Sequence, residues 1–209
     1  MESVGLKQAL EELRKEKKRK FTQSVDLVVN LKGIDLRRDN ISVVASIPYK
    51  VKEKKVCGFL EEKNPAIKTI TKPEFEKYKD KDALKSLVDE YDFFISNAKL
   101  MPAVATIFGK ALGPAGKMPS PQLGIITEEK SETIKSLVEK ISKSVKLRAK
   151  EASLKVCVGK EDMDDEKIIE NVRAVHAAIV NSLPKKEENL KNTKIKFTMT
   201  RAINVEVSK

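Results

Sequence analysis

Apolar and polar residues alternate along several segments near the two ends of the chain. Two lie near the N-terminus, Ser24–Leu31 ("SVDLVVNL") and Ile41–Ile47 ("ISVVASI"), and three near the C-terminus, Ser153–Lys160, Lys194–Met199 and Ala202–Ser208. A period of two with one apolar face is typical of antiparallel strands that cover a core on one side only. We therefore expect strands in all five segments, with the first two forming an antiparallel pair.

The same outer regions contain two segments in which apolar residues have helical spacing. The first is Val4–Leu13, and the second runs from Asp164 to Leu183 with an apolar residue at every third or fourth position. Asp164 or Asp165 fits the N-cap of the second helix, because a carboxylate there can accept free backbone N–H groups.

The middle of the chain has a different pattern. Val56–Leu60 and Tyr91–Ala98 contain short unbroken apolar runs, which are typical of strands buried on both faces. Segments with helical periodicity alternate with them: Lys81–Tyr91, Met101–Leu112 and Ser131–Val145. Strands that alternate with helices predict a small α/β unit with a parallel sheet.

These two patterns predict a discontinuous two-domain α/β protein. Residues 1–50 and 152–209 are expected to form an outer α+β domain, with a mainly antiparallel sheet and helices on one face. Residues 51–151 are expected to form an inserted Rossmann-like domain of three layers.

The stretch Phe108–Gly124, "FGKALGPAGKMPSPQLG", is rich in glycine and proline, so we expect it to interrupt helix and strand as a rigid loop exposing Lys110 and Lys117. It does not match a P-loop, since Met118 stands where serine or threonine should follow Gly-Lys. No Gly-x-Gly-x-x-Gly pattern occurs in the chain either. Specific nucleotide binding is therefore not favoured.

Charge narrows the class of partner. The chain has 42 Lys and Arg against 31 Asp and Glu, a net charge of +11, which favours a polyanionic partner. No stretch approaches the roughly 20 apolar residues of a membrane span, and the N-terminus lacks a secretory signal. We expect a cytoplasmic protein with free thiols at Cys57 and Cys157 and no membrane partner.

Neither catalysis nor metal binding is favoured. The single histidine, His176, lies beside the apolar stripe of its helix. With two distant cysteines it cannot supply a tetrahedral zinc site without carboxylates, and no ligand spacing occurs. We expect no catalytic residue, no metal and no cofactor.

Two basic runs, Arg14–Phe21 and Lys140–Lys155, fit either a solvated surface or an RNA-binding one. Phe21, next to the first strand, fits either a core residue or an aromatic that stacks on a base. Lysines greatly outnumber arginines, which favours contacts to phosphate over the reading of base edges. The residues together indicate a protein that binds structured RNA.

The segment Leu112–Pro121, "LGPAGKMPSP", resembles the signature of the large-subunit ribosomal protein L-one (uL-one) family, archaeal type. The resemblance implies a non-enzymatic, ribosome-bound protein, monomeric when free, that binds large-subunit rRNA at the base of a mobile stalk. It also implies assistance in releasing deacylated tRNA from the exit site and repression of the chain's own mRNA through a leader that imitates the rRNA site.

The resemblance also implies functional residues. Lys20, Phe21, Thr198 and Met199 match the main RNA-binding positions of the family, and Thr200 stands where the family has glycine. The implied lesser contacts are, on a strand, Lys155, Gly159 and Lys160 and, as secondary contacts to RNA or tRNA, Lys110 and Lys117. The alternatives are an enzyme or binding module for a phosphorylated substrate, which would use the Gly/Pro stretch, and a DNA-binding regulator.

Overall fold

The computed structural model describes residues 4–17, 19–35, 41–78, 80–121, 123–127, 129–149 and 151–207. The protein is a mixture of helices and sheets, as predicted. It divides into two compact units, Met1–Val51 with Lys143–Lys209 (unit 1) and Lys52–Ser142 (unit 2). No helix within the described ranges is both long and apolar enough to cross a membrane.

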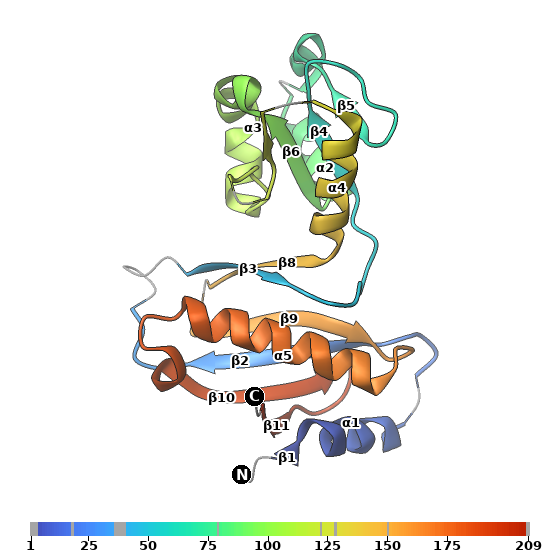
Figure 1. Cartoon of the computed structure of the whole chain (residues 1–209), viewed down its shortest axis with the longest axis vertical. Helices are drawn as coiled ribbons and strands as arrows, with labels where there is room; N and C mark the ends of the chain where they lie inside the picture. The colour runs from blue at the N-terminus through green and yellow to red at the C-terminus, as the bar shows by residue number, and fades with distance from the viewer. Residues whose placement is uncertain are drawn as a thin grey trace. The chain divides into compact units, whose positions relative to one another are not determined.

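Unit 1 contains a five-stranded sheet. Its strands, in spatial order, are β1 (Val4–Gly5), β11 (Ile203–Glu206), β10 (Leu190–Phe197), β2 (Ser24–Leu31) and β9 (Ser153–Lys160). β2 pairs antiparallel with both neighbours, whereas β1 runs parallel to β11. Two helices, α1 (Leu6–Lys15) and α5 (Asp165–Ser182), pack against one face of this sheet (Figure 1).

Alternation produces the core of unit 1. Val25, Leu27 and Val29 of β2 are fully buried, while the residues between them are only partly buried. One polar residue of the core, Asn171 on α5, is completely buried and donates to the carbonyl oxygens of Tyr49 and Val158 at 3.1 and 2.9 Å. These bonds join α5 to β9 and to the segment after β3 (Ser42–Ser46).

The pairing of β3 differs from the prediction. β3 pairs antiparallel with β8 (Ser144–Arg148) and not with β2. The helix that was expected to reach Val145, α4 (Ser131–Ser142), ends three residues earlier, and the strand that follows it belongs to unit 1. Alternation determines which face of a strand is buried but not which strand lies beside it, so the partner was predicted wrongly. Residues 36–40, in the expected turn between β2 and β3, lie outside the described residues.

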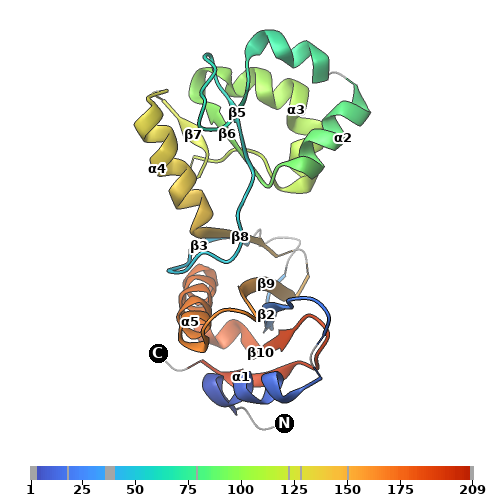
Figure 2. The same ribbon diagram turned by 90° about the vertical axis from the view of Figure 1, so that its right-hand side faces the viewer.

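Unit 2 contains a parallel sheet in the order β5 (Lys68–Ile70), β4 (Val56–Phe59), β6 (Phe93–Asn97) and β7 (Ile125–Ile126). Helix α4 lies on one face and two helices lie on the other (Figure 2): α2 (Lys81–Glu90) and α3 (Met101–Ala115). Short 3₁₀ segments complete the chain: η1 (Lys72–Tyr78), η2 (Ala98–Leu100) and, in unit 1, η3 (Lys186–Asn189).

Successive residues of the buried strands point to opposite faces of this sheet, and both faces are covered by helices. Phe59 and Phe94 stack with ring centroids 5.6 Å apart on the α2–α3 side. Leu60 and Ile95, which follow them in sequence, pack with Ile134 of α4 on the other side. This explains why the strands of unit 2 are continuously apolar rather than alternating.

The Gly/Pro stretch is not a continuous loop, contrary to the prediction. Helix α3 continues to Ala115, with Pro114 inside its last turn, and ends at Gly116, whose φ of 70° is left-handed. The Gly116 N–H donates to the Gly113 carbonyl and the Lys117 N–H to the Leu112 carbonyl, both at 3.0 Å. This is a Schellman motif, for which glycine is the preferred residue. Gln122, in the loop that follows, lies outside the described residues.

Lys117 caps a neighbouring helix instead of projecting freely into solvent. Its ammonium donates to the carbonyl oxygens of Val88 and Tyr91 at 2.6 and 2.9 Å. These carbonyls lie at the C-terminal end of α2, whose last turn contains no basic residue of its own. A cation at this position compensates free carbonyls and the negative end of the helix dipole.

We predict that Lys117→Met lowers the free energy of unfolding by about 1–3 kcal/mol, since it leaves two carbonyls without their charged donor. Lys110→Met is the matched control, because Lys110 is exposed on α3, and it should change stability by less than about 0.5 kcal/mol. Urea unfolding followed by tyrosine fluorescence measures both. Equal losses for the two variants would contradict a capping role for Lys117.

Candidate RNA interface

The face of the unit 1 sheet opposite α1 and α5 is polar and partly or fully exposed. Strand register places Lys194, Val28 and Lys155 in one row across β10, β2 and β9. The next row contains Lys196, Asp26 and Cys157. Cross-strand neighbours in a row have Cβ atoms about 4.5–5.5 Å apart, so the lysines flank the central strand on both sides. We call this surface the open face.

A bulge decides which residue at the end of β9 reaches the open face. Register shifts between Val25 and Asp26, so that Lys160 pairs with Ser24 and shares its side of the sheet. Gly159 instead faces the core, where a Cβ atom would come within 2.9 Å of Ile168 Cγ1. The bulge therefore presents Lys160 to solvent, and packing against α5 explains the glycine before it. Any RNA contact of Gly159 is limited to its backbone.

The turn after β10 is tied to the start of β2 by three hydrogen bonds. The Thr198 amide donates to the Ser24 carbonyl at 3.1 Å, and the Ser24 amide donates to Thr198 Oγ1 at 3.0 Å. The two hydroxyl oxygens also lie 3.0 Å apart. The Thr198 side chain is thus both exposed and fixed, which suits a contact residue.

Thr200 performs a task in this turn that glycine could not. Its hydroxyl oxygen accepts the Phe197 amide at 2.9 Å, and its own amide donates to the Phe197 carbonyl at 3.3 Å. Its φ is not left-handed, since Lys186 is the one non-glycine residue with positive φ in the described part of the chain. The turn therefore has an ordinary backbone conformation that threonine adopts without strain.

Two large apolar side chains at this end of the sheet are exposed to solvent, Phe21 at 53% and Met199 at 57% of their surface. Of the two alternatives that the sequence left open for Phe21, a core position is thus excluded. Lys20, beside Phe21, is also exposed. The side chains of Lys20, Lys160, Phe21 and Met199 are therefore all exposed around the end of the sheet where β2 begins and β9 and β10 end.

The basic run at the end of α1 is only partly available for RNA. Arg14 is bound within the protein, since its guanidinium donates to Asp165 Oδ1 at 2.6 and 2.9 Å. It also donates to the carbonyl oxygens of Glu161 and Met163 at 2.8 and 2.9 Å. Lys18, of the same run, and Lys150, of the second basic run, lie outside the described residues.

Sequence reasoning missed three residues that support this surface: Ser24, Gln23 and Glu161. Gln23 is 2% exposed and bonded to both Glu161 and Met199. Its partners are more than 130 positions away in sequence, so no local pattern could have revealed it.

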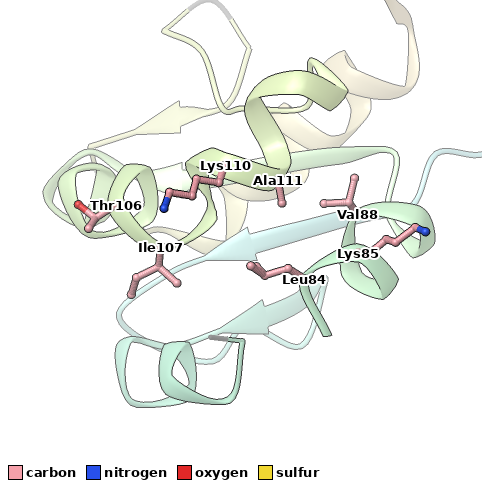
Figure 3. A pocket seen from close by; sticks show the side chains of 7 residues that line it. All are labelled: Leu84, Lys85, Val88, Thr106, Ile107, Lys110 and Ala111. Carbon is pink, nitrogen blue, oxygen red and sulfur yellow. The ribbon is translucent and has the colours of Figure 1, made fainter. Parts of the chain in front are cut away.

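Lys110 lies in unit 2, at the rim of an apolar groove between α2 and α3 (Figure 3). The groove has a volume of about 640 Å³. Its lining residues are Leu84, Lys85, Val88, Thr106, Ile107, Lys110 and Ala111. They include no carboxylate, histidine or cysteine, which are the side chains that most often bind metal ions.

Unit 2 has a second place where a phosphate could be expected, the carboxyl ends of β4 and β6, where the strand order reverses direction. The Glu129 carboxylate already fills that position. It accepts the amides of Glu61 and Glu62 at 2.9 and 3.2 Å and the Asn97 side-chain amide at 2.6 Å. The donors that could hold a substrate phosphate are therefore engaged by the protein's own acid, which argues against the phosphorylated-substrate alternative.

The histidine and the two cysteines of the chain show no arrangement typical of a catalytic or metal site. Burial lowers the pKa of His176, and burial raises the pKa of the Cys57 thiol to about 12. Both cysteines are free. Within the described residues, no group of three or more His, Cys, Asp or Glu side chains could hold a metal ion.

Comparison with known proteins identifies the family. Similar proteins named large ribosomal subunit protein uL1 include one from Thermococcus kodakarensis, 36% identical over 201 residues and 91% of each chain. Another, from Methanocaldococcus jannaschii, is 34% identical over 100% of this chain and 98% of its own length. A third, from Korarchaeum cryptofilum, is 37% identical over 85% of this chain and 83% of its own. The model of the ribosomal protein L1p/L10e family matches residues 13–201, and the chain therefore belongs to this family, as its Gly/Pro signature predicted.

Proposed function

We propose that the chain is a structural constituent of the large ribosomal subunit that binds rRNA through the open face and the turn after β10. Membership of a family of ribosomal proteins makes it a structural protein rather than an enzyme. One observation carries the assignment of the site. Within the described residues, the large apolar side chains classed as exposed are Phe21 and Met199, and both lie at the lysine-bearing end of one sheet.

The proposed mechanism is recognition of a folded RNA by shape. Lys20, Lys155 and Lys160 neutralise phosphates and release counterions, which makes affinity fall as salt rises. Phe21 stacks on a base or ribose, and stacking of this kind contributes about 1–3 kcal/mol. The Thr198–Met199 turn approaches the RNA as a rigid protrusion, because its backbone is already hydrogen-bonded to β2. Lysines on a flat sheet position the backbone of the RNA, and the shape of the RNA supplies specificity.

The family resemblance supports further parts of the proposal. The rRNA site is the base of the mobile stalk, the chain assists release of deacylated tRNA from the exit site, and it represses its own mRNA through a similar leader. It acts in the cytoplasm on the ribosome and is monomeric when free. Lys110, exposed on unit 2, supplies a secondary contact to RNA or tRNA, whereas Lys117 contributes by holding α2.

Salt dependence tests the electrostatic part of this mechanism. We predict that the slope of log K against log salt for a stalk-base rRNA fragment decreases by about one when Lys155→Ala removes a phosphate contact. Lys7→Ala is the charge-matched control, because Lys7 is exposed on α1, which covers the other face of the sheet. Identical slopes for the two variants would contradict the mechanism. Tighter binding of duplex DNA than of the rRNA fragment would favour the DNA-binding alternative.

The turn is tested by truncating its side chains. We expect Thr198→Ala and Met199→Ala each to weaken binding to the same fragment about tenfold, equivalent to about 1.4 kcal/mol. Lys110→Ala should leave it within about twofold, since unit 2 is not the main site. Filter binding at one salt concentration measures all three, and a larger loss for Lys110→Ala would move the main site to unit 2.

Unit 1 is expected to fold and bind RNA by itself, because its sheet, helices and core cluster are complete without unit 2. A chain that joins residues 1–51 to residues 143–209 through a short glycine linker tests this expectation. We predict cooperative unfolding and an affinity for the stalk-base fragment within about tenfold of the full chain. A folded chain that does not bind would mean that unit 2 holds the primary site.

A further inference from the structure

One buried side chain, Gln23, connects the segments that contain the proposed RNA contacts. It lies between Phe21 and the first residue of β2, Ser24, and is 2% exposed. Its side-chain oxygen accepts the Met199 amide at 3.1 Å. Its side-chain nitrogen donates to Glu161 Oε2 at 3.3 Å, and its backbone amide donates to the same oxygen at 3.2 Å.

A third bond joins Gln23 and Glu161, in which the Glu161 amide donates to the Gln23 carbonyl at 2.9 Å. Glu161 directly follows Lys160, and its own carbonyl accepts Arg14 at 2.8 Å. Gln23 therefore joins the approach to β2, the end of β9 and the turn after β10. Each of these segments contains a proposed contact: Phe21, Lys160 and Met199.

We propose that the Gln23–Glu161 pair is a positioning element that holds these three segments in their RNA-binding arrangement. This inference rests on the proposed function. Neither side chain has to touch RNA, because Gln23 acts by fixing the Met199 amide and Glu161 acts by orienting Gln23. An arrangement that is fixed before binding loses less conformational freedom in the complex, which strengthens affinity without adding a contact.

The orientation of the Gln23 amide follows from its partners. The oxygen must face the Met199 N–H and the nitrogen must face the Glu161 carboxylate, since the reverse would oppose donor to donor and acceptor to acceptor. Glu161 is thus required as an acceptor, and Gln23 is required as both donor and acceptor. This asymmetry predicts different outcomes for exchanges that conserve size.

The test exchanges amide and carboxylate within the pair. Gln23→Glu brings two carboxylates together in a buried place and should weaken binding to the stalk-base rRNA fragment about tenfold. Glu161→Gln should cost less than about threefold, because its amide oxygen can accept both bonds from Gln23. The double exchange should restore binding to within about threefold of the unmodified chain. The new carboxylate accepts the Met199 amide and the side-chain NH2 of the new glutamine, whose oxygen accepts the backbone amide of residue 23.

A second readout separates positioning from general stability. Hydrogen exchange at the Met199 amide, followed by NMR, should accelerate in Gln23→Glu and return to normal in the double exchange. Asn171→Ala is the control for stability, because Asn171 is buried and its side chain bonds to Tyr49 and Val158 rather than to the turn or to Gln23. It should lower the midpoint of urea unfolding while RNA affinity, measured where the protein is folded, stays unchanged. If Gln23→Glu does not fold, Gln23→Ala tests the same bond to Met199.

The outcomes distinguish this inference from the proposed function. If Thr198→Ala weakens binding but Gln23→Glu and Gln23→Ala do not, the positioning role is overturned and the RNA site stands. If none of these variants weakens binding, the proposed RNA site itself fails. If the double exchange binds no better than Gln23→Glu, or if Asn171→Ala weakens binding equally, the effect is one of stability alone and the inference is wrong.

Discussion

Unit 1 depends on the two-sided pairing of strand β2. One face of β2 inserts Val25, Leu27 and Val29 into a core with α1 and α5, while β9 and β10 occupy both of its edges. Because the strand cannot shift by one residue without exposing that apolar face, its polar face is equally fixed. The lysines of the neighbouring strands are thereby held in rows across a surface that helices leave uncovered.

The end of this sheet combines exposure with rigidity. Phe21 and Met199 are exposed, yet the backbone around them is held by Thr198, Gln23 and Ser24 through hydrogen bonds across more than 130 positions of sequence. An apolar side chain in water is tolerated singly, but two at one end of a basic surface suit a partner that covers them. The bonding of the turn means that this surface is shaped by the protein's own hydrogen bonds.

Unit 2 shows how a motif that resembles a ligand site can be structural. Gly116 ends α3, Lys117 caps α2, and Glu129 fills the crevice at the ends of β4 and β6. Lys117 and the amides at this crevice could have met a phosphate, but Lys117 is bound to backbone carbonyls and the amides are bound to the Glu129 carboxylate. The segment Leu112–Pro121 resembles the family signature, and the roles that the structure gives to its Gly116 and Lys117 are to end α3 and to cap α2.

Periodicity by itself predicted β2, β3, β9, β10 and β11 of unit 1 and β4 and β6 of unit 2, because hydrophobic burial acts on every turn or strand locally. It did not predict β1, β5, β7 or β8. The family motif predicted Lys20 and the Thr198–Met199 turn as contact residues, and Phe21 was singled out both by that motif and by its place beside the basic run. Only the tertiary structure decided that β3 pairs with β8, that a bulge turns Lys160 outward and that Lys117 is bonded. Pairing, register shifts and long-range hydrogen bonds depend on which segments meet in space, and a local pattern contains no record of that choice.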